Sequence, residues 1–373
     1  MDRFVLFTTL SLIGGMSFAV STALAGSGSC SLGPGDHTSQ TLSSGGLERV
    51  YDVYVPPGCD PEQPFAMVLD FHGGLSTRAV HRLISDFRGK AQEHGFVLVQ
   101  PEGTGDDPGD AVGVTNSWNV GYEFLGPKFD YHDDVAFVRE LVARVGEQLP
   151  IDPQRIYATG HSMGGGMAHL LACRAADLFR AVAPVAFWLQ APEVVACDPS
   201  RPIPVRIYHA FYDGVVCYDE SLPHLIFGDV DCPAWEPHRR SAPDGFARWR
   251  DIDGCTGTPT TLILPVFFSR FDEFTSCRSG ARVGLWSLTT NYNPQEPCPF
   301  NPFVTCPGLS DHNPYTNLNQ VDIEEDAWQF FVSVPEPRRT TLALAALIAL
   351  ATTRAARRRW PCASASRQLA PRA

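Results

Sequence analysis

The sequence predicts an α/β protein in which helices cover both faces of a mostly parallel central sheet. Nearly continuous apolar runs at 65–71 and 96–100 are typical of strands buried on both faces, and the helix-like stretch 80–93 separates them. A glycine-flanked serine, Ser162, lies between a strand-like run and a helix-like stretch and is the second indication. Four further apolar runs are expected to join the sheet: 155–159, 181–186, 204–209 and 282–287.

One domain is expected over residues 26–333, because no internal repeat or linker interrupts them. It begins with an alternating segment, 49–55, which predicts an antiparallel strand with one face in solvent. Helix-like patterns at 135–148 and 325–333 supply further covering helices. Insertions are expected as loops at two places, after Asp213 and after Ser287.

The first 25 residues have the pattern of a secretory signal peptide. Arg3 precedes an apolar stretch at 4–20, and Ala23-Leu24-Ala25 matches an A-x-A cleavage site. An ordinary buried helix is the alternative, and the small residues before Gly26 argue against it. The sequence therefore predicts that residues 1–25 direct the chain out of the cytosol.

Eleven cysteines indicate an oxidising compartment, because disulfides persist in secreted proteins and are rare in the cytosol. Ten of them lie between Cys30 and Cys306, an even number, and Cys362 stands apart. Short separations favour three pairs: Cys217 with Cys232, Cys255 with Cys277, and Cys298 with Cys306. The other four would pair among themselves: Cys30, Cys59, Cys173 and Cys197. No cysteine or histidine spacing matches a zinc site, so no metal and no other cofactor is expected.

The charge of the chain argues against nucleic acid as a substrate or partner. The whole chain has a formal charge of −12, but residues 26–337 contain 20 lysines and arginines against 40 aspartates and glutamates, which gives −20. A body of this charge repels polyanions.

Gly160-His161-Ser162-Met163-Gly164 has the pattern of a nucleophile elbow. It follows the strand-like run 155–159 and leads into a helix-like stretch at 167–172, which is the strand, turn and helix context that such an elbow requires. The glycines allow a turn sharp enough to lift the serine hydroxyl clear of the sheet. Ser162 is therefore the candidate nucleophile, and the amide of Met163 is the first candidate donor of an oxyanion hole.

A serine nucleophile needs a histidine base and a carboxylate that orients it. In an elbow-containing α/β sheet the acid follows the nucleophile and the histidine comes last. Asp213 follows the strand-like run 204–209, and His312 is the only histidine after His238. Asp213 and His312 are the expected partners of Ser162, with three acids as fallbacks for Asp213: Asp219, Asp229 and Asp231.

The second oxyanion donor is expected in His72-Gly73-Gly74-Leu75, the turn after the apolar run 65–71. Glycines there allow close backbone approach, and the donor is the amide of either Gly74 or Leu75. Three other histidines are expected to have structural rather than catalytic roles: His72, His161 and His209.

Five motifs occur in an order and spacing that resemble the secreted polyhydroxybutyrate depolymerase and feruloyl esterase (LpqC-like) family. They are Asp70-Phe71-His72-Gly73-Gly74, Asn116-Ser117-Trp118-Asn119, 133–138, 160–168 and 209–213. The resemblance covers about 48–333 and implies an α/β-hydrolase fold, a triad of Ser162, Asp213 and His312, and a wall of the acyl pocket at Trp118. A core aromatic is the alternative for Trp118. Two departures from the family pattern are Ala210 in the acid motif and the Pro/Cys-rich insertion before His312.

The tail, residues 334–373, resembles a PEP-CTERM sorting signal of bacterial surface proteins. Val334-Pro335-Glu336-Pro337 precedes an apolar run at 342–351 and then Arg357-Arg358-Arg359. The resemblance implies recognition and processing by an exosortase and a secreted or cell-surface location in a bacterium. The apolar run is shorter than the ~20 residues that span a bilayer. A poorly ordered basic tail after the last helix is the alternative.

The sequence as a whole predicts a secreted, monomeric serine carboxylic ester hydrolase that acts through an acyl-enzyme. Its expected substrate is an ester-bearing polymer or oligomer, either with feruloyl or acetyl groups on polysaccharide or of the polyhydroxybutyrate type. One alternative is a surface-attached protein that keeps the fold but has lost the alignment of His312. Another is an acyl transferase, because an acyl-enzyme can pass its group to an alcohol instead of water.

Overall fold

The computed structural model describes residues 28–104, 116–121, 132–190, 196–213, 215–219, 241–265, 268–290, 312–316 and 321–335, and the backbone of 297–298 and 301–305. The chain divides into two units, Met1–Val334 and Pro335–Ala373, and the fold described below belongs to the first. Two predictions, the signal peptide at 1–25 and nearly all of the tail at 334–373, lie outside the described residues. No helix among the described residues is both long and apolar enough to cross a membrane.

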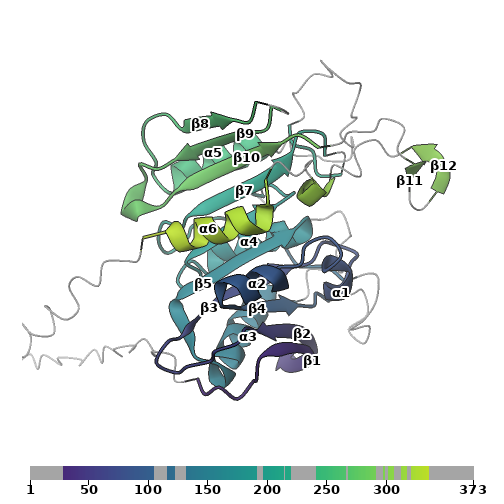
Figure 1. Ribbon diagram of the computed structural model, residues 1–373. Coiled ribbons are helices and arrows are strands. Elements are labelled where there is room, and N and C mark those ends of the chain that lie inside the picture. Colours follow the sequence, from purple (N-terminus) through teal and green to yellow (C-terminus); the bar gives the residue numbers. More distant parts are fainter. Residues whose placement is uncertain are drawn as a thin grey trace, which may run out of the picture. The chain divides into compact units, whose positions relative to one another are not determined.

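Ten strands form one sheet in the described part of the chain: β1 (Gly35–Ser44), β2 (Leu47–Val55), β3 (Phe65–Phe71), β4 (Phe96–Pro101), β5 (Ile151–His161), β6 (Ala181–Val185), β7 (Val205–Ala210), β8 (Thr260–Ile263), β9 (Arg270–Phe274) and β10 (Val283–Leu288). Their order across the sheet is β1-β2-β4-β3-β5-β6-β7-β10-β9-β8 (Figure 1). The strands from β4 to β10 run parallel. Antiparallel strands flank them, β1 and β2 on one side and β9 and β8 on the other.

The helices are α1 (Arg78–His81), α2 (Arg88–His94), α3 (Asp134–Gln148), α4 (Met163–Arg174), α5 (Ala242–Ile252) and α6 (Ile323–Ser333). Short 3₁₀ turns, η3 (Arg278–Gly280) and η5 (Pro314–Thr316), and a separate pair of strands, β11 (Pro297–Cys298) and β12 (Asn301–Thr305), complete the described elements.

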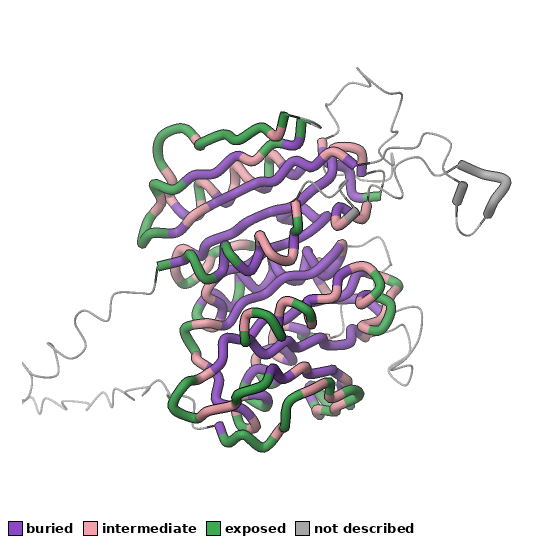
Figure 2. Tube along the Cα trace, viewed as in Figure 1, coloured by how far each residue is buried: buried purple, intermediate pink, exposed green. Residues whose placement is uncertain are grey.

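Helices cover both faces of the sheet, and β3 shows how its side chains divide between them. Met67 and Leu69 belong to the core cluster that contains side chains of α3, α4 and α5. Val68, the residue between them, belongs to the second cluster, with side chains of α2 and α6. Because successive residues of a strand point to opposite faces, a strand covered on both sides must be apolar throughout. Figure 2 shows these central strands as buried and the outer strand β8 as exposed.

The predicted α/β-hydrolase class of fold is therefore confirmed. Each apolar run expected in the sheet is a strand, and the alternating segment 49–55 lies in β2, which pairs antiparallel with β1 and β4. The expected solvent-exposed face of this segment is wrong, because none of its residues is exposed and Asp52 is buried against Arg78 and Arg82. The helix-like patterns 135–148 and 325–333 correspond to α3 and α6. The helix after Ser162 starts earlier than its predicted stretch, at Met163.

The prediction of one helix over 80–93 is wrong, because the structure divides this stretch into α1 and α2. The two helices are separated by a contact with Glu324, a residue near the C-terminal end of the domain sequence. Glu324 accepts hydrogen bonds from the amide of Asp86 at 2.8 Å and from Ser85 Oγ at 3.2 Å. An amide bonded to a side chain in this way is not available to continue an α-helix.

The strands that sequence analysis did not predict lie at or near the edges of the sheet. β1 and β8 are largely exposed, and Leu262 and Ile263 of β8 are 51% and 54% exposed. An exposed edge strand has no buried face to enforce a periodic apolar pattern. α5 was also unpredicted, and it follows the segment 220–240, which lies outside the described residues.

Three disulfides lie in the described residues: Cys30–Cys59, Cys173–Cys197 and Cys255–Cys277. They confirm the expected pair of Cys255 with Cys277 and the expectation that the four unassigned cysteines pair among themselves. Cys217 is also disulfide-bonded, but its predicted partner Cys232 lies outside the described residues, as does Cys306. Disulfides of this number are typical of proteins made in an oxidising compartment.

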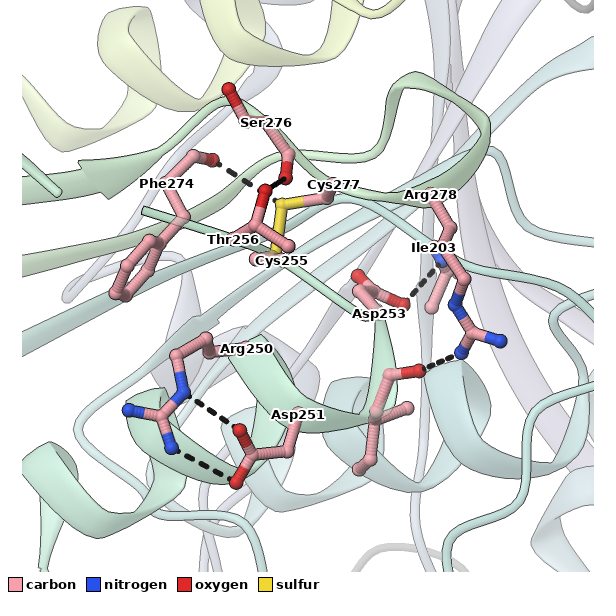
Figure 3. The surroundings of a disulfide bond; sticks show 11 residues. Ile203, Arg250, Asp251, Asp253, Cys255, Thr256, Phe274, Ser276, Cys277 and Arg278 are labelled. Atoms are coloured by element: carbon pink, nitrogen blue, oxygen red, sulfur yellow. Dashed lines mark hydrogen bonds and ion pairs between the residues drawn. A yellow bond between two sulfur atoms is a disulfide. The ribbon is translucent and has the colours of Figure 1, made fainter. Parts of the chain in front are cut away.

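A buried carboxyl lies beside the Cys255–Cys277 disulfide (Figure 3). Asp253 is fully buried; its Oδ1 accepts a hydrogen bond from the amide of Ile203 at 3.1 Å. Its Oδ2 has no hydrogen-bond partner among the described residues. Burial raises the pKa of Asp253 to about 7, and the Ile203 amide and nearby arginines only partly oppose this shift.

We expect Asp253 to make the protein less stable as the pH rises from about 4 to about 7. The folded state holds the proton up to the raised pKa, whereas an unfolded chain releases it near the ordinary value, so folding is favoured at the acid end. Asp253→Asn removes this charge and should raise the free energy of unfolding above pH 7 by on the order of 1–3 kcal/mol. Urea unfolding across this pH range measures the effect.

The matched control is Asp251→Asn, two residues away. Asp251 is exposed and bonded to Arg250, which lowers its pKa, so its replacement should not remove the decline in stability with pH. If the free energy of unfolding depends on pH in the same way in wild type and in Asp253→Asn, folding does not raise the pKa of Asp253, and the prediction is wrong.

Candidate active site

The nucleophile elbow forms where β5 meets α4. Ser162, the residue between them, has φ 55° and ψ −126°, a backbone conformation that is costly for a residue with a side chain. Its amide donates to the carbonyl of Val185 on the neighbouring strand at 2.9 Å, which holds the strained turn in place. Backbone strain of this kind clusters at functional sites, which supports a functional role for Ser162.

The glycines of the elbow are required by close backbone contacts. A Cβ on Gly160 would lie 2.6 Å from the carbonyl oxygen of Phe71, and one on Gly164 would lie 2.0 Å from the same atom. Both positions therefore accept only glycine. Because Phe71 is the last residue of β3, these contacts bring the elbow against the strand end that carries the His72–Leu75 turn.

The amide of Met163 is placed as an oxyanion donor requires. Met163 is the first residue of α4, and the first hydrogen bond within that helix is donated by Gly166 to the carbonyl of Ser162, at 3.0 Å. The Met163 amide thus belongs to the first turn, whose amides have no acceptor inside the helix and carry the positive end of its dipole. It immediately follows the serine, as the predicted role demands.

The turn with the second candidate donor lies directly beside Ser162. A Cβ on Gly73 would be 3.2 Å from Ser162 Cβ, and one on Gly74 would be 2.5 Å from Met163 Sδ. Leu75 adopts a left-handed conformation, with φ 54°, and its side chain is 52% exposed. Gly74 and Leu75 both remain candidates for the second donor.

Trp118 contacts the first residue of this turn, His72. Its ring is fully buried, its Nε1 donates to the carbonyl of His72 at 2.8 Å, and it contacts Phe71 edge to face with 5.2 Å between ring centroids. These contacts favour the core-aromatic alternative for Trp118. Its role as a wall of an acyl pocket stays a prediction.

Asp213 meets His312 at the carboxyl end of β7. His312 Nδ1 lies 2.9 Å from Asp213 Oδ2 and 3.0 Å from Oδ1. The amides of Val215 and Val216 donate to Oδ1 at 2.9 and 2.8 Å, so the carboxylate is held on two sides. Burial alone would raise the pKa of Asp213, but His312 and His209 hold it well below its usual range. Asp213 is therefore ionised, and because a carboxylate can only accept a hydrogen bond, His312 Nδ1 carries the hydrogen and donates it to Asp213.

The turn at 72–75, Ser162 and Asp213 thus lie at the carboxyl ends of β3, β5 and β7, and His312 joins them through its contacts with Asp213 and His161. The carboxyl ends of parallel strands meet at one edge of the sheet, which explains why residues far apart in sequence are neighbours here. His312 reaches this edge despite the insertion that precedes it. Two fallback acids, Asp229 and Asp231, lie outside the described residues.

Three further side chains hold the site: His161 and His209, for which structural roles were expected, and Ser117, for which no role was predicted. Ser117 Oγ donates to Met163 Sδ at 2.9 Å, which fixes the side chain at the start of α4. His209 Nε2 contacts the carbonyl of Val216 at 2.6 Å and so braces the Asp213 turn. His161 Nε2 contacts the carbonyl of His312 at 2.6 Å. All three belong to motifs that resemble the family, but a motif does not reveal which distant residue each side chain contacts.

One group of described residues, Glu93, His94 and Glu325, offers three possible metal ligands within 4.8 Å of one another. It lies on α2 and α6, away from the elbow elements. His94 Nε2 bonds to Glu325 at 2.8 Å, and Lys90 Nζ lies 3.1 Å from the same carboxylate. Lys90 and His94 therefore already bind Glu325, and the group gives no reason to assign a metal to the candidate active site.

The fold and the elbow define the class as an α/β-hydrolase. A family model described as putative esterase matches residues 44–240, more than half of the chain. The chain belongs to this esterase family. The predicted carboxylic ester hydrolase is thereby confirmed at the level of the family.

Curated relatives include two feruloyl esterases. Feruloyl esterase B of Piromyces equi is 29% identical over 240 residues, which cover 63% of this chain and 41% of that protein. Feruloyl esterase C of Emericella nidulans is 27% identical over 296 residues, which cover 77% of this chain and 95% of that protein. This chain therefore spans less than half of the first of these relatives and almost all of the second.

The chain is also similar to a further curated esterase and to the solved structure of another esterase. Putative esterase NocK of Nocardia uniformis subsp. tsuyamanensis is 33% identical over 200 residues, which cover 53% of each chain. Among solved structures, acetyl xylan esterase from Aspergillus awamori has a TM-score of 0.45 at 12% identity, over 68% of this chain and 94% of that chain.

Proposed function

We propose that this protein is a secreted serine carboxylic ester hydrolase with Ser162 as nucleophile, His312 as general base and acid, and Asp213 as the orienting carboxylate. The observation that carries the proposal is the contact of His312 Nδ1 with both oxygens of the ionised Asp213, beside a strained elbow serine. A histidine held by a carboxylate close to the elbow serine supports the roles that acyl transfer needs.

The contact with Asp213 determines which nitrogen of His312 acts as the base. Since the carboxylate holds the proton on Nδ1, the unprotonated nitrogen is Nε2. In the proposed reaction Nε2 takes the proton of Ser162 Oγ while Oγ bonds to the ester carbonyl carbon. The same proton then passes to the alkoxy oxygen as the ester C–O bond breaks and the alcohol leaves.

Water completes the cycle. It gives a proton to His312 Nε2 as its oxygen attacks the acyl-enzyme, and that proton returns to Ser162 Oγ when the carboxylic acid is released. In both steps the negative charge on the carbonyl oxygen is proposed to be bound by the amide of Met163 and by that of Gly74 or Leu75. Both amides belong to turns next to Ser162, which supports this part of the proposal.

We propose feruloyl or acetyl groups on polysaccharide as the substrate. The names of the relatives support this class, since they include feruloyl esterases and a bifunctional acetylxylan esterase/xylanase from Neocallimastix patriciarum. The acidic character of residues 26–337 is compatible with a neutral polysaccharide and disfavours a polyanion.

A location outside the cytosol is part of the proposal. The disulfides Cys30–Cys59, Cys173–Cys197 and Cys255–Cys277 support it, because such bonds persist in oxidising compartments. The cleavage-site pattern at Ala23-Leu24-Ala25 agrees. Processing of the tail by an exosortase, and a monomeric state, stay predictions from sequence.

The test is turnover of a substrate panel by purified protein: methyl ferulate, acetylated xylan, short p-nitrophenyl esters and hydroxybutyrate oligomers. We expect the highest kcat/KM on methyl ferulate or acetylated xylan. A preference for hydroxybutyrate oligomers would overturn the substrate class but not the esterase. Transfer to an added alcohol in preference to water would indicate the acyl transferase.

A fluorophosphonate probe labels an activated serine and does not require the correct ester. It therefore distinguishes a protein without an activated serine from an active enzyme whose substrate is missing from the panel. Failure of wild-type protein to turn over every ester and to react with the probe would favour the surface-attached, catalytically degenerate alternative.

A further inference from the structure

His161 joins the nucleophile elbow to the segment that carries His312. It is the last residue of β5, immediately before Ser162, and only 5% of its surface is exposed. Its Nε2 lies 2.6 Å from the backbone carbonyl oxygen of His312, and the two rings have centroids 4.9 Å apart. A Cβ on Gly73 would be 3.5 Å from His161 Nδ1, so the ring also borders the turn of the candidate oxyanion hole.

The contact defines the protonation state of His161. A carbonyl oxygen can only accept a hydrogen bond, so Nε2 must carry the hydrogen. Burial, followed by the nearby His312, lowers the pKa of His161 to about 3. The other titratable groups that act on it are His81 and Asp213, and the ring of Tyr315 lies 6.3 Å away. His161 is therefore a neutral Nε2–H donor.

A neutral donor suits this place better than a cationic one. During the proposed reaction His312 becomes positively charged, and a permanent cation next to it would oppose that change. A lysine or arginine could hold the carbonyl of His312 but would add such a charge. Neutral imidazole holds the carbonyl without that penalty.

The two ends of His312 are held from two different strands. Asp213, just beyond β7, holds the ring at Nδ1, and His161, at the end of β5, holds the backbone oxygen. These contacts fix both the position of the backbone and the direction of the ring. Such support matters here because the insertion before His312 makes a long connection from β10.

We propose that His161 is a positioning residue for His312, which keeps His312 Nε2 in reach of Ser162 by a neutral hydrogen bond to the His312 carbonyl. The inference rests on the proposed function, because it assigns His161 a part in the activity of the same site. His161 itself touches no reacting atom in this account.

The test compares two replacements of His161. His161→Phe keeps a buried ring without a donor and should lower kcat on the best ester of the panel by about 10²-fold, because misplacement of a catalytic group by about 1 Å has an effect of this size. KM should change by less than about threefold, since the substrate contacts remain. His161→Gln places an amide donor in the same space and should keep kcat within about tenfold of wild type.

His169→Phe is the matched control for loss of a buried imidazole. His169 is buried on α4, burial lowers its pKa to about 3, and its Nδ1 accepts from Trp249 Nε1 at 3.0 Å. This change should lower stability and leave kcat within about twofold of wild type while the protein is folded. Equal losses of kcat in His161→Phe and His169→Phe, or equal losses in the Phe and Gln variants of His161, would overturn the proposal.

A second readout does not depend on turnover. In ¹⁵N NMR spectra of wild type, His161 should remain a neutral Nε2–H imidazole down to about pH 5, and titration near the ordinary pKa of about 6.5 would overturn the proposal. The Nδ1 proton of His312 should exchange faster in His161→Phe than in wild type.

If wild type turns over no ester, the proposed function fails, and the exchange rate still decides whether His161 positions His312. If His161→Phe does not fold, the same comparison is made with His161→Gln, where an exchange rate and kcat both unlike wild type would count against the proposal.

Discussion

Replacement of Ser162 with alanine is expected to lower kcat by about 10⁴-fold or more, the loss typical of a serine triad that loses its nucleophile. The physical reason is that the acyl-enzyme cannot form without Oγ, so only binding and oxyanion stabilisation remain. Because the elbow strain belongs to the backbone of Ser162, alanine should keep the turn and the fold. Kinetics on the best ester, together with fluorophosphonate labelling, measure the loss.

The sharper form of this prediction uses two variants together. His312→Ala should lose activity to a similar extent, and the double variant Ser162→Ala/His312→Ala should be no worse than Ser162→Ala alone, because residues that act as a unit are not additive. A double variant whose loss equals the product of the two single losses would show that the two side chains act independently.

The control is Ser31→Ala. Ser31 is exposed, and its hydroxyl donates to the carbonyl of Gln148, the last residue of α3, at 3.0 Å. Full activity in this variant would show that the loss belongs to Ser162. Retention of labelling in Ser162→Ala would move the nucleophile to another residue.

The second large effect is expected from Asp213→Asn, about 10⁴-fold in kcat. The structure predicts which way the new amide points. Oδ1 accepts from the amides of Val215 and Val216, so the asparagine oxygen should stay there and its NH₂ should face His312 Nδ1. An NH₂ group in that place requires an unprotonated Nδ1, which leaves the hydrogen on Nε2 and removes the base.

Asp219→Asn is the matched control, because Asp219 is the fallback acid within the described residues. It should keep kcat within about threefold of wild type. A large loss in Asp219→Asn with a small loss in Asp213→Asn would reverse the assignment of the acid. ¹⁵N NMR of His312 gives the tautomer directly, with Nδ1–H expected in wild type and Nε2–H in Asp213→Asn.

The parts of the fold that could be predicted are those for which one interaction dominates. The strands β3 and β4 lie at the centre of the sheet, and burial on both faces left no choice but a continuous apolar run. The strands β1 and β8 escaped prediction, because an exposed edge tolerates polar residues and gives no period to detect. The division of 80–93 into α1 and α2 depends on Glu324, which no local pattern could reveal.

The candidate site divides in the same way. Ser162 and its neighbouring glycines could be predicted because the elbow has a local signature, and Asp213 and His312 followed from their order along the chain. The roles of His161 and Ser117 could not, since each acts through a contact with a residue distant in sequence.

The sequence by itself determined the class of fold, the nucleophile and the order of the candidate catalytic residues, because these depend on local backbone geometry and on the burial of whole strands. Only the tertiary structure decided that His312 meets Asp213 in spite of the insertion, that Trp118 bonds to the His72 carbonyl, and that His161 holds the His312 carbonyl. These are contacts between strand ends, and such contacts exist only after the parallel sheet has brought those ends to one edge.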